Sequence, residues 1–162
     1  MPTVCKKPSG CTADELREFV ELDRAGGKIK QPQKLPERVL RAKCLAFHRV
    51  RSQLVGIAAL KVTRDTYTED VFEQRAFCGD DWEKFGLEVG YVYVVPEYQG
   101  KHISRKVVEA VLRKAKGQNV FATTEPGGRM CKTLERLGFE RCGGEYEAEA
   151  EGDRLVLYLR RS

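Results

Sequence analysis

The first periodic run of apolar residues predicts a helix near the start of the chain. The positions that recur at helical spacing are Leu16, Phe19 and Val20. Thr12 and Glu15 form the pattern of a capping box just before this run, and the glycines at 26–27 end it. We therefore expect a helix over residues 13–25, then a basic connector and a short second helix over 36–43 that begins with a proline.

The β-type runs that follow predict six strands. They cover residues 44–50, 54–62, 87–95, 119–123, 139–142 and 154–159. The run at 54–62 is apolar on both faces, as expected of a central strand. The run at 87–95 ends before Pro96, because proline cannot continue the interior of a sheet.

Three further helices are predicted after the strands at 44–50 and 54–62, which we expect to form a hairpin. They cover residues 69–77, 103–116 and 130–137, and the last two carry apolar stripes that end at Gly117 and Gly138. The order of elements predicts a mixed α/β fold, with one mostly antiparallel sheet flanked by helices on both faces. The polar segment 64–85 is expected to cover one end of this sheet.

Length and composition favour a globular protein of one domain. A chain of 162 residues can bury about 68–70% of its unfolded surface. With 41% hydrophobic and 33% charged residues, the chain is neither disordered nor of low complexity. We predict a single domain over residues 1–162, with 1–11 as a flexible N-terminal segment. No apolar run can span a bilayer and residues 1–13 do not resemble a secretory signal, so we expect a cytoplasmic protein without membrane contact.

The six cysteines are scattered and form no C-x-x-C pair. They are Cys5, Cys11, Cys44, Cys78, Cys131 and Cys142. Since no secretory signal is seen, we expect reduced thiols. The two histidines are far from any paired cysteines, so no metal site is predicted.

Positive charge is concentrated in two stretches. The formal net charge is +5, and residues 28–51 carry many lysines and arginines against the single acid Glu37. A second basic stretch covers 101–116. Such asymmetry indicates an anionic partner. The candidates are a nucleic acid, a phosphate-bearing cofactor and an acidic protein. The alternative is two helix faces that are simply solvated.

The most informative segment is residues 92–105, where a buried strand is followed by a tight turn that opens directly into a helix. The backbone N–H groups at a helix N-terminus suit a phosphate. Lys101, Arg105 and Lys106 add positive charge at the same place.

This segment, the element order and the Leu-Gly-Phe sequence at 137–139 resemble the GNAT superfamily of acyl-CoA-dependent N-acyltransferases. The family's strand-to-helix turn carries [Gln/Arg]-x-x-Gly-x-[Gly/Ala] and cradles the pyrophosphate of CoA. The matching residues are Gln99, Gly100, Lys101, His102, Ile103 and Ser104. His102 and Ser104 replace the two small motif residues. A helical backbone at His102 would leave room for the imidazole beside the phosphate, whereas a left-handed one would compromise the site.

The resemblance also implies roles for residues around the turn. The backbone of Val92, Tyr93 and Val94 would pair with the pantetheine arm of acetyl-CoA, and residues 100–105, which end at Arg105, would hold the pyrophosphate. In this family a bulge near this point splays two strands and makes the slot for the acyl group.

Glu88 is the candidate general base. It lies eleven residues before Gln99, where histone-acetylating members of the family place a glutamate that takes a proton from the amine. The alternative is a solvent-facing acid at the start of a strand. The family's acid tyrosine is replaced by Leu134 and its CoA-contacting asparagine by Gly127. The tyrosines that would substitute as acid are Tyr91, Tyr93 and Tyr146.

Cys131 is read as a packed helix residue rather than a nucleophile, because no histidine and acid partner can be identified for it. The leading hypothesis is an N-acetyltransferase that moves an acetyl group from acetyl-CoA to an amine. The acceptor is a small amine, an antibiotic, or a lysine or N-terminus of a protein, and the basic stretch adds an acidic or phosphorylated acceptor. The alternatives are a non-catalytic CoA-binding or partner-binding module and, third, a nucleic-acid-binding protein.

Overall fold

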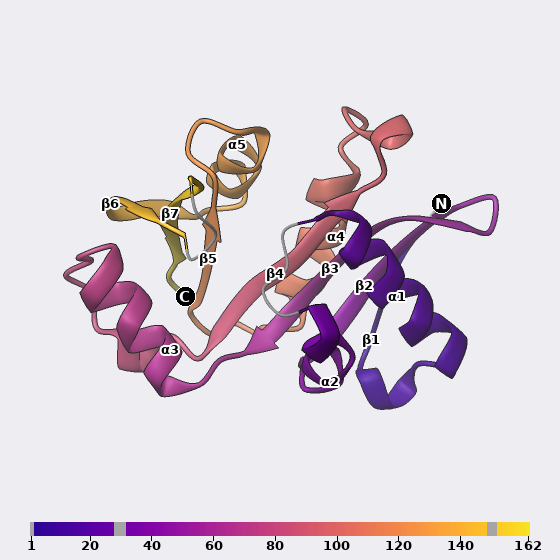
Figure 1. The fold of residues 1–162 in the computed structure, drawn as a ribbon, viewed down its shortest axis with the longest axis horizontal. Coiled ribbons are helices and arrows are strands. Elements are labelled where there is room, and N and C mark those ends of the chain that lie inside the picture. The colour runs from indigo at the N-terminus through magenta and orange to yellow at the C-terminus, as the bar shows by residue number, and fades with distance from the viewer. Residues whose placement is uncertain (1, 28–31, 149–151) are drawn as a thin grey trace. The chain divides into compact units, whose positions relative to one another are not determined.

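The computed structural model describes residues 2–27, 32–148 and 152–162, which form seven strands and five α-helices (Figure 1). The strands are β1 (Thr3–Lys6), β2 (Cys44–Val50), β3 (Gln53–Val62), β4 (Leu87–Val94), β5 (Val120–Thr124), β6 (Glu140–Glu147) and β7 (Arg154–Arg160). The α-helices are α1 (Ala13–Ala25), α2 (Leu35–Leu40), α3 (Asp65–Glu69), α4 (Ile103–Arg113) and α5 (Arg129–Arg136). The basic residues at 28 and 30 lie outside the described residues.

The strands follow the order β1-β2-β3-β4-β5-β7-β6 in a mostly antiparallel sheet, which confirms the predicted fold class. The pairing of β4 with β5 is parallel and joins Leu87 to Val120 and Glu88 to Phe121. The chain groups into two compact units, one of residues 1–61 and 89–114, the other of residues 62–88 and 115–162. None of the helices in the described part of the chain is long and apolar enough to cross a membrane.

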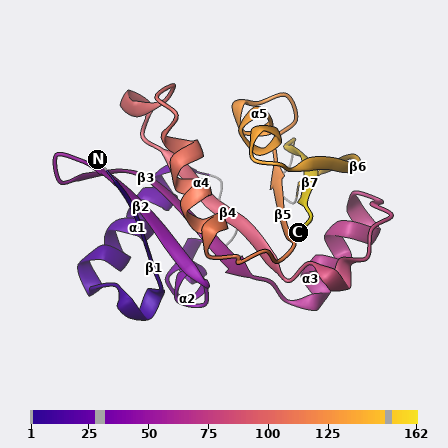
Figure 2. The same ribbon diagram turned by 180° about the vertical axis from the view of Figure 1, so that it is seen from behind.

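In the first unit, α1 and α2 cover one face of the strands and α4 covers the other (Figures 1 and 2). The helices α1 and α2 contribute Phe19, Val20, Leu35 and Val39 to a core that includes Phe47 and Ile57 of the strands. On the opposite face, Ile103 at the start of α4 packs against Val55 and Val94. The strands β2 and β3 are therefore buried on both faces, as the apolar run at 54–62 predicts.

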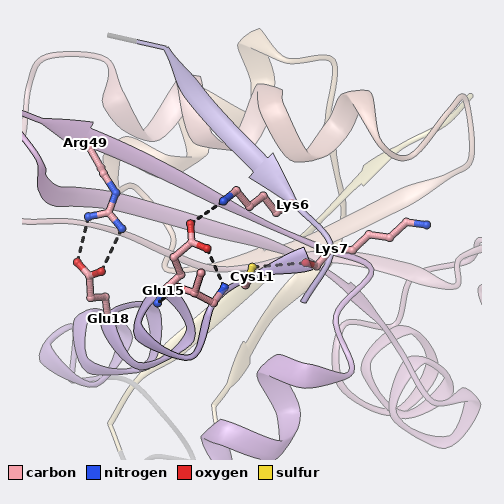
Figure 3. Close-up of polar contacts among 7 residues, drawn as sticks. Lys6, Lys7, Cys11, Glu15, Glu18 and Arg49 are labelled. Carbon is pink, nitrogen blue, oxygen red and sulfur yellow. Dashed lines mark hydrogen bonds and ion pairs between the residues drawn. The ribbon is translucent and has the colours of Figure 1, made fainter. Parts of the chain in front are cut away.

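The N-terminal residues of this unit are held by charged contacts (Figure 3). Residues 3–6, within the segment predicted to be flexible, form β1 and pair with β2. Lys6 Nζ donates to Glu15 at 2.7 Å, and the predicted capping box of Thr12 and Glu15 is present at the start of α1. Arg49 of the basic stretch forms a bidentate pair with Glu18, at 3.0 and 3.1 Å, so its charge is compensated within the protein.

In the second unit, the segment between β3 and β4 covers one face of β5, β7 and β6. The predicted helix at 69–77 is displaced toward the N-terminus: α3 ends at Glu69 and a π-helical turn, Asp70–Arg75, continues it. Phe72 on this turn packs against Phe121 of β5 with ring centroids 5.3 Å apart. Tyr158 alternates with Leu157 and Leu159 along β7, so it faces the opposite side, where it is hydrogen-bonded to Cys131 of α5.

The strand β6 continues to Glu147, beyond the predicted end at residue 142, and contains a bulge between Cys142 and Tyr146. Gly143 has φ +76°, and a Cβ there would lie 2.1 Å from the carbonyl oxygen of Ala76. The carbonyl of Ala76 accepts a hydrogen bond from the N–H of Gly144 at 2.9 Å. Gly143 and Gly144 therefore let the segment between β3 and β4 approach the backbone of β6 closely.

The expectation of reduced thiols is wrong for two of the six cysteines. Cys78 and Cys142 form a disulfide, with their Cα atoms 5.4 Å apart. They are separated by 64 positions in the sequence, and only the packing of the covering segment on β6 brings them together. The other four cysteines are free thiols.

Candidate active site

The turn between β4 and α4 has the geometry of a phosphate-binding loop. The strand β4 ends at Val94, and the N–H of Val95 donates to the carbonyl of Val55 on β3 at 2.9 Å. Gln99 folds back, and its Nε2 donates to the Val94 carbonyl at 3.0 Å. Two left-handed residues, Gly100 at φ +80° and His102 at φ +62°, then direct the chain into α4. Left-handed residues before a helix orient successive N–H groups toward one point, which suits an anion.

His102 adopts the left-handed conformation rather than the helical one, which is the outcome that we expected to compromise the site. A non-glycine residue in this region costs about 1–2 kcal/mol, although histidine is enriched there several-fold relative to most residues. The side chain of His102 is exposed. The backbone thus keeps the conformation that glycine adopts easily, and the imidazole projects from the turn toward solvent.

The start of α4 is seated closely on the sheet. Ile103 is only 5% exposed. A Cβ on Gly56 of β3 would lie 2.6 Å from Cγ2 of Ile103, so only glycine lets the helix come this near. This contact fixes the position of the first N–H groups of α4, which have no partner within the helix.

The basic side chains around the turn differ in what they contact. Lys101 Nζ lies 5.2 Å from the centre of the Tyr98 ring, in a cation–π contact. Arg105 forms an ion pair with Glu109 at 2.8 Å, one turn along α4. Lys106 is exposed and Ser104 half-buried. The turn therefore carries positive charge, and the charge of Arg105 is already compensated by Glu109.

The strand β4 is distorted just before this turn. Tyr91 has φ +53°, an exceptional value for a non-glycine residue within a strand. Val92 and Tyr93 are half-buried, whereas Val94 is buried. Tyr91 and Tyr93 pack against the core beneath α1 and α2. This distortion lies near the place where the resemblance implies a bulge, and no residue type in the sequence indicates it.

Glu88 lies in the second unit and is buried, with 3% of its surface exposed. Its Oε2 accepts a hydrogen bond from the hydroxyl of Tyr67 on α3 at 2.9 Å. Tyr146 on β6 is also buried, its hydroxyl is hydrogen-bonded to Thr123, and burial followed by the nearby charge of Glu88 raises its phenol pKa. The reading of Glu88 as a solvent-facing acid is therefore wrong.

Comparison with known proteins agrees with this geometry. A model of the Acetyltransferase (GNAT) family matches residues 14–139, which is most of the chain. The chain belongs to the GNAT family of acetyltransferases. No curated protein sequence matched it.

Solved structures of GNAT proteins share the fold over nearly the full length. An acyl-CoA N-acyltransferase from Pseudomonas aeruginosa is 15% identical with a TM-score of 0.71, over 98% of this chain and 97% of that one. ElaA of Escherichia coli is 14% identical with a TM-score of 0.72, over 98% of each chain. The acetyltransferase YncA of Salmonella typhimurium, solved with acetyl-CoA, is 14% identical with a TM-score of 0.67, over 99% of this chain and 94% of that one.

Against the GNAT pattern, the α5 region of this chain lacks the tyrosine and the asparagine of the family. Leu134, in place of the tyrosine, is 1% exposed and part of the packed interior. Gly127, in place of the asparagine, has φ +76° in the turn after β5. Cys131 is buried and donates to the carbonyl of Glu125 at 3.3 Å, which agrees with a packed residue.

Sequence reasoning did not identify two buried or hydrogen-bonded residues, Tyr67 and Asp23. Tyr67 belongs to the irregular covering segment, whose position on the sheet no periodicity reveals. Asp23 occupies the apolar stripe of α1, one turn after Phe19 and Val20, and is 7% exposed. An acid at a core position of the stripe is a signal that the sequence does contain.

One group of potential metal ligands occurs among the described residues: Cys78, Asp80 and Cys142, whose ligand atoms lie within 4.8 Å of one another. The two cysteines form the disulfide, and Arg161 contacts the carboxylate of Asp80. With the disulfide closed, this group offers no thiolate to a metal.

Proposed function

We propose that this GNAT protein transfers the acetyl group of acetyl-CoA to a primary amine, with Glu88 as the general base. The observation that carries the proposal is the β4–α4 turn, where left-handed Gly100 and His102 lead into a closely seated helix N-terminus. Family membership gives the broad chemistry, and this turn supports a retained site for the cofactor pyrophosphate.

Each predicted cofactor residue has a role in this proposal. The N–H groups of residues 100–105 hold the pyrophosphate, and the ammonium groups of Lys101 and Lys106 add attraction. The backbone of residues 92–94 pairs with the pantetheine arm, beginning just after the left-handed Tyr91.

Acetyl transfer requires a neutral amine that attacks the carbonyl carbon of the thioester. Glu88 takes the proton of the substrate ammonium, directly or through a water molecule. The carbon–nitrogen bond forms as a tetrahedral intermediate, and its collapse breaks the carbon–sulfur bond. The hydrogen bond from Tyr67 fixes one oxygen of Glu88, so that the carboxylate has a defined orientation.

The leaving group does not require the missing tyrosine. A thiol with a pKa near about 8.5 is a tolerable leaving group as its thiolate. Of the three tyrosines named as substitutes, Tyr146 belongs to the same unit as Glu88, and burial keeps its phenol protonated. We assign no other residue as acid, because the CoA thiolate can leave unprotonated and then take a proton from solvent.

Replacing Glu88 with Gln tests the base. Because general-base catalysis contributes typically about 10²–10⁴-fold, E88Q should lower kcat by about 100-fold or more and weaken the rise of rate with pH. The matched control is E83Q, which removes an exposed carboxylate from the same unit. Release of CoA thiol is measured across a panel of amines from pH 6 to 9. An unchanged pH profile in E88Q would remove Glu88 from the base role.

The buried Leu134 favours one alternative, a non-catalytic module that binds CoA or a partner. Tight binding of acetyl-CoA without turnover on any amine of the panel would support this alternative. The acceptor of the leading proposal is a small amine, an antibiotic, or a lysine or N-terminal amine of a protein. We retain the cytoplasm as the proposed location, although the Cys78–Cys142 disulfide is a bond that a reducing compartment disfavours.

A further inference from the structure

Cys5 and Cys44 are two free thiols on neighbouring strands of the first unit. Cys5 on β1 pairs with Ala46 of β2, and Cys44 lies two residues before Ala46. Since residues two apart along a strand point to the same face, the two cysteines are diagonal cross-strand neighbours on one face. Their thiols are hydrogen-bonded to each other. The proposed acetyl transfer uses neither of them.

The helix α4 covers this face of the strands, opposite to α1 and α2 (Figure 2). Two residues before Cys5, Thr3 Oγ1 and His48 Nδ1 are hydrogen-bonded at 3.0 Å, which holds β1 in register with β2. At the C-terminal end of α4, the charges of Arg113 and Lys114 lie near Cys5. The thiol pair therefore lies between a strand edge and the basic end of a helix.

The two thiols differ in access and in acidity. Cys44 is 2% exposed, whereas Cys5 is half-buried. The hydrogen bond with Cys44 lowers the pKa of Cys5, and the charges of Lys114 and Arg113 act in the same direction, whereas burial opposes them. The same hydrogen bond and burial raise the pKa of Cys44. Cys5 is therefore the thiol that solutes reach and that ionises first, and Cys44 is its protonated neighbour.

We propose that Cys5 and Cys44 form a site of reversible oxidation by hydroperoxides, which joins β1 to β2 by a disulfide. The thiolate of Cys5 attacks one oxygen of hydrogen peroxide, the oxygen–oxygen bond breaks, and hydroxide leaves, so that Cys5 becomes a sulfenic acid. The sulfur of Cys44 then attacks the sulfur of Cys5, and the sulfenic oxygen leaves as water with the proton of Cys44. Two thiols lose two electrons in all, and the peroxide is reduced to two molecules of water.

The backbone can accommodate this bond. A disulfide needs Cα atoms no more than about 7 Å apart, and diagonal cross-strand neighbours lie about 7–8 Å apart. The strand β1 has four residues and lies at the edge of the sheet, so it can make the small shift that closure requires. The inference does not depend on the transferase function.

The test exposes the native protein to hydrogen peroxide, then denatures it and counts its free thiols. Wild type should fall from four free thiols to two, with a mass loss of two hydrogen atoms. A peptide map without reductant should show the Cys5 peptide joined to the Cys44 peptide, and dithiothreitol should separate them. These measurements on wild type need no variant that folds.

Three variants separate the roles of the two thiols. C5S should keep Cys44 as a thiol, because the group that peroxide reaches is gone. C44S should stop at the sulfenic acid of Cys5, which dimedone traps. The matched control is C11S, which removes another half-buried thiol of the same unit and should still lose two thiols. Four thiols after peroxide in wild type, a bond from Cys5 to Cys11 or to a second chain, or oxidation of Cys44 in C5S would overturn the proposal.

Discussion

At His102 the backbone keeps the left-handed conformation of the GNAT motif glycine although the residue carries a Cβ. The sequence left two conformations open, because residue type biases φ without determining it. In the structure, His102 lies two positions after the left-handed Gly100 and directly before the closely seated Ile103.

Asp23 should make the stability of the protein depend on pH. Its folded pKa of about 6 lies above the unfolded value of 3.8. The folded state therefore binds more protons between these values, and stability is lost as pH rises from about 4 through 6. The shift corresponds to a loss of up to about 3 kcal/mol.

D23N removes this loss. The difference in free energy of unfolding between D23N and wild type should therefore shift in favour of D23N by about 1–3 kcal/mol between pH 4 and pH 7. The measurement is urea unfolding of wild type, D23N and E21Q at several pH values. The stability of E21Q should change with pH in the same way as that of wild type, because Glu21 on the same helix is exposed. A constant difference between D23N and wild type across this range would show that Asp23 ionises normally.

At the scale of elements, the covering segment and β6 depend on each other. Disulfide Cys78–Cys142, the bulge at Gly143 and the hydrogen bond from Gly144 to Ala76 all join them. The same segment carries Tyr67, which contacts Glu88. A loosened covering segment should therefore disturb the orientation of the candidate base.

The disulfide closes a loop of 64 positions, for which chain-entropy estimates give a stabilisation of about 4 kcal/mol. We expect C78S with C142S to lose about 2–4 kcal/mol of stability, within the usual range for disulfides. Unfolding under oxidising and reducing conditions measures this, with C11S as a control that removes a free thiol. Equal stability of wild type in the two conditions would contradict a stabilising bond.

Elements with strong periodicity were predictable, and elements made by tertiary contacts were not. The stripe of α4 and the capping box of α1 are local signals, and both helices occur where they predict. The strand β1 has four residues and no alternation of its own, and it exists because β2 offers an edge. The π-helical turn at Asp70–Arg75 depends on how Phe72 packs against Phe121 and Phe85, which no local pattern specifies.

At the scale of the whole molecule, the mixed α/β class and the GNAT resemblance were confirmed. The strand, turn and helix of the β4–α4 segment were predictable because one short segment contains them. Partners that lie far apart in sequence were not predictable, since Tyr67 is 21 positions from Glu88 and Cys78 is 64 from Cys142. The roles of these residues in acetyl transfer remain predictions that rest on cofactor binding.

The most direct test of the account is the thermal midpoint with and without saturating acetyl-CoA, with adenosine 3′,5′-bisphosphate as a probe of the nucleotide end. Ligand at a hundred times its Kd contributes about 2.7 kcal/mol, or a rise of roughly 5–10 °C for a chain of this size. The account predicts this rise in wild type and in H102G, because the backbone at residue 102 already has the glycine conformation. No rise in wild type would contradict it, and a rise confined to H102G would show that the imidazole closes the turn.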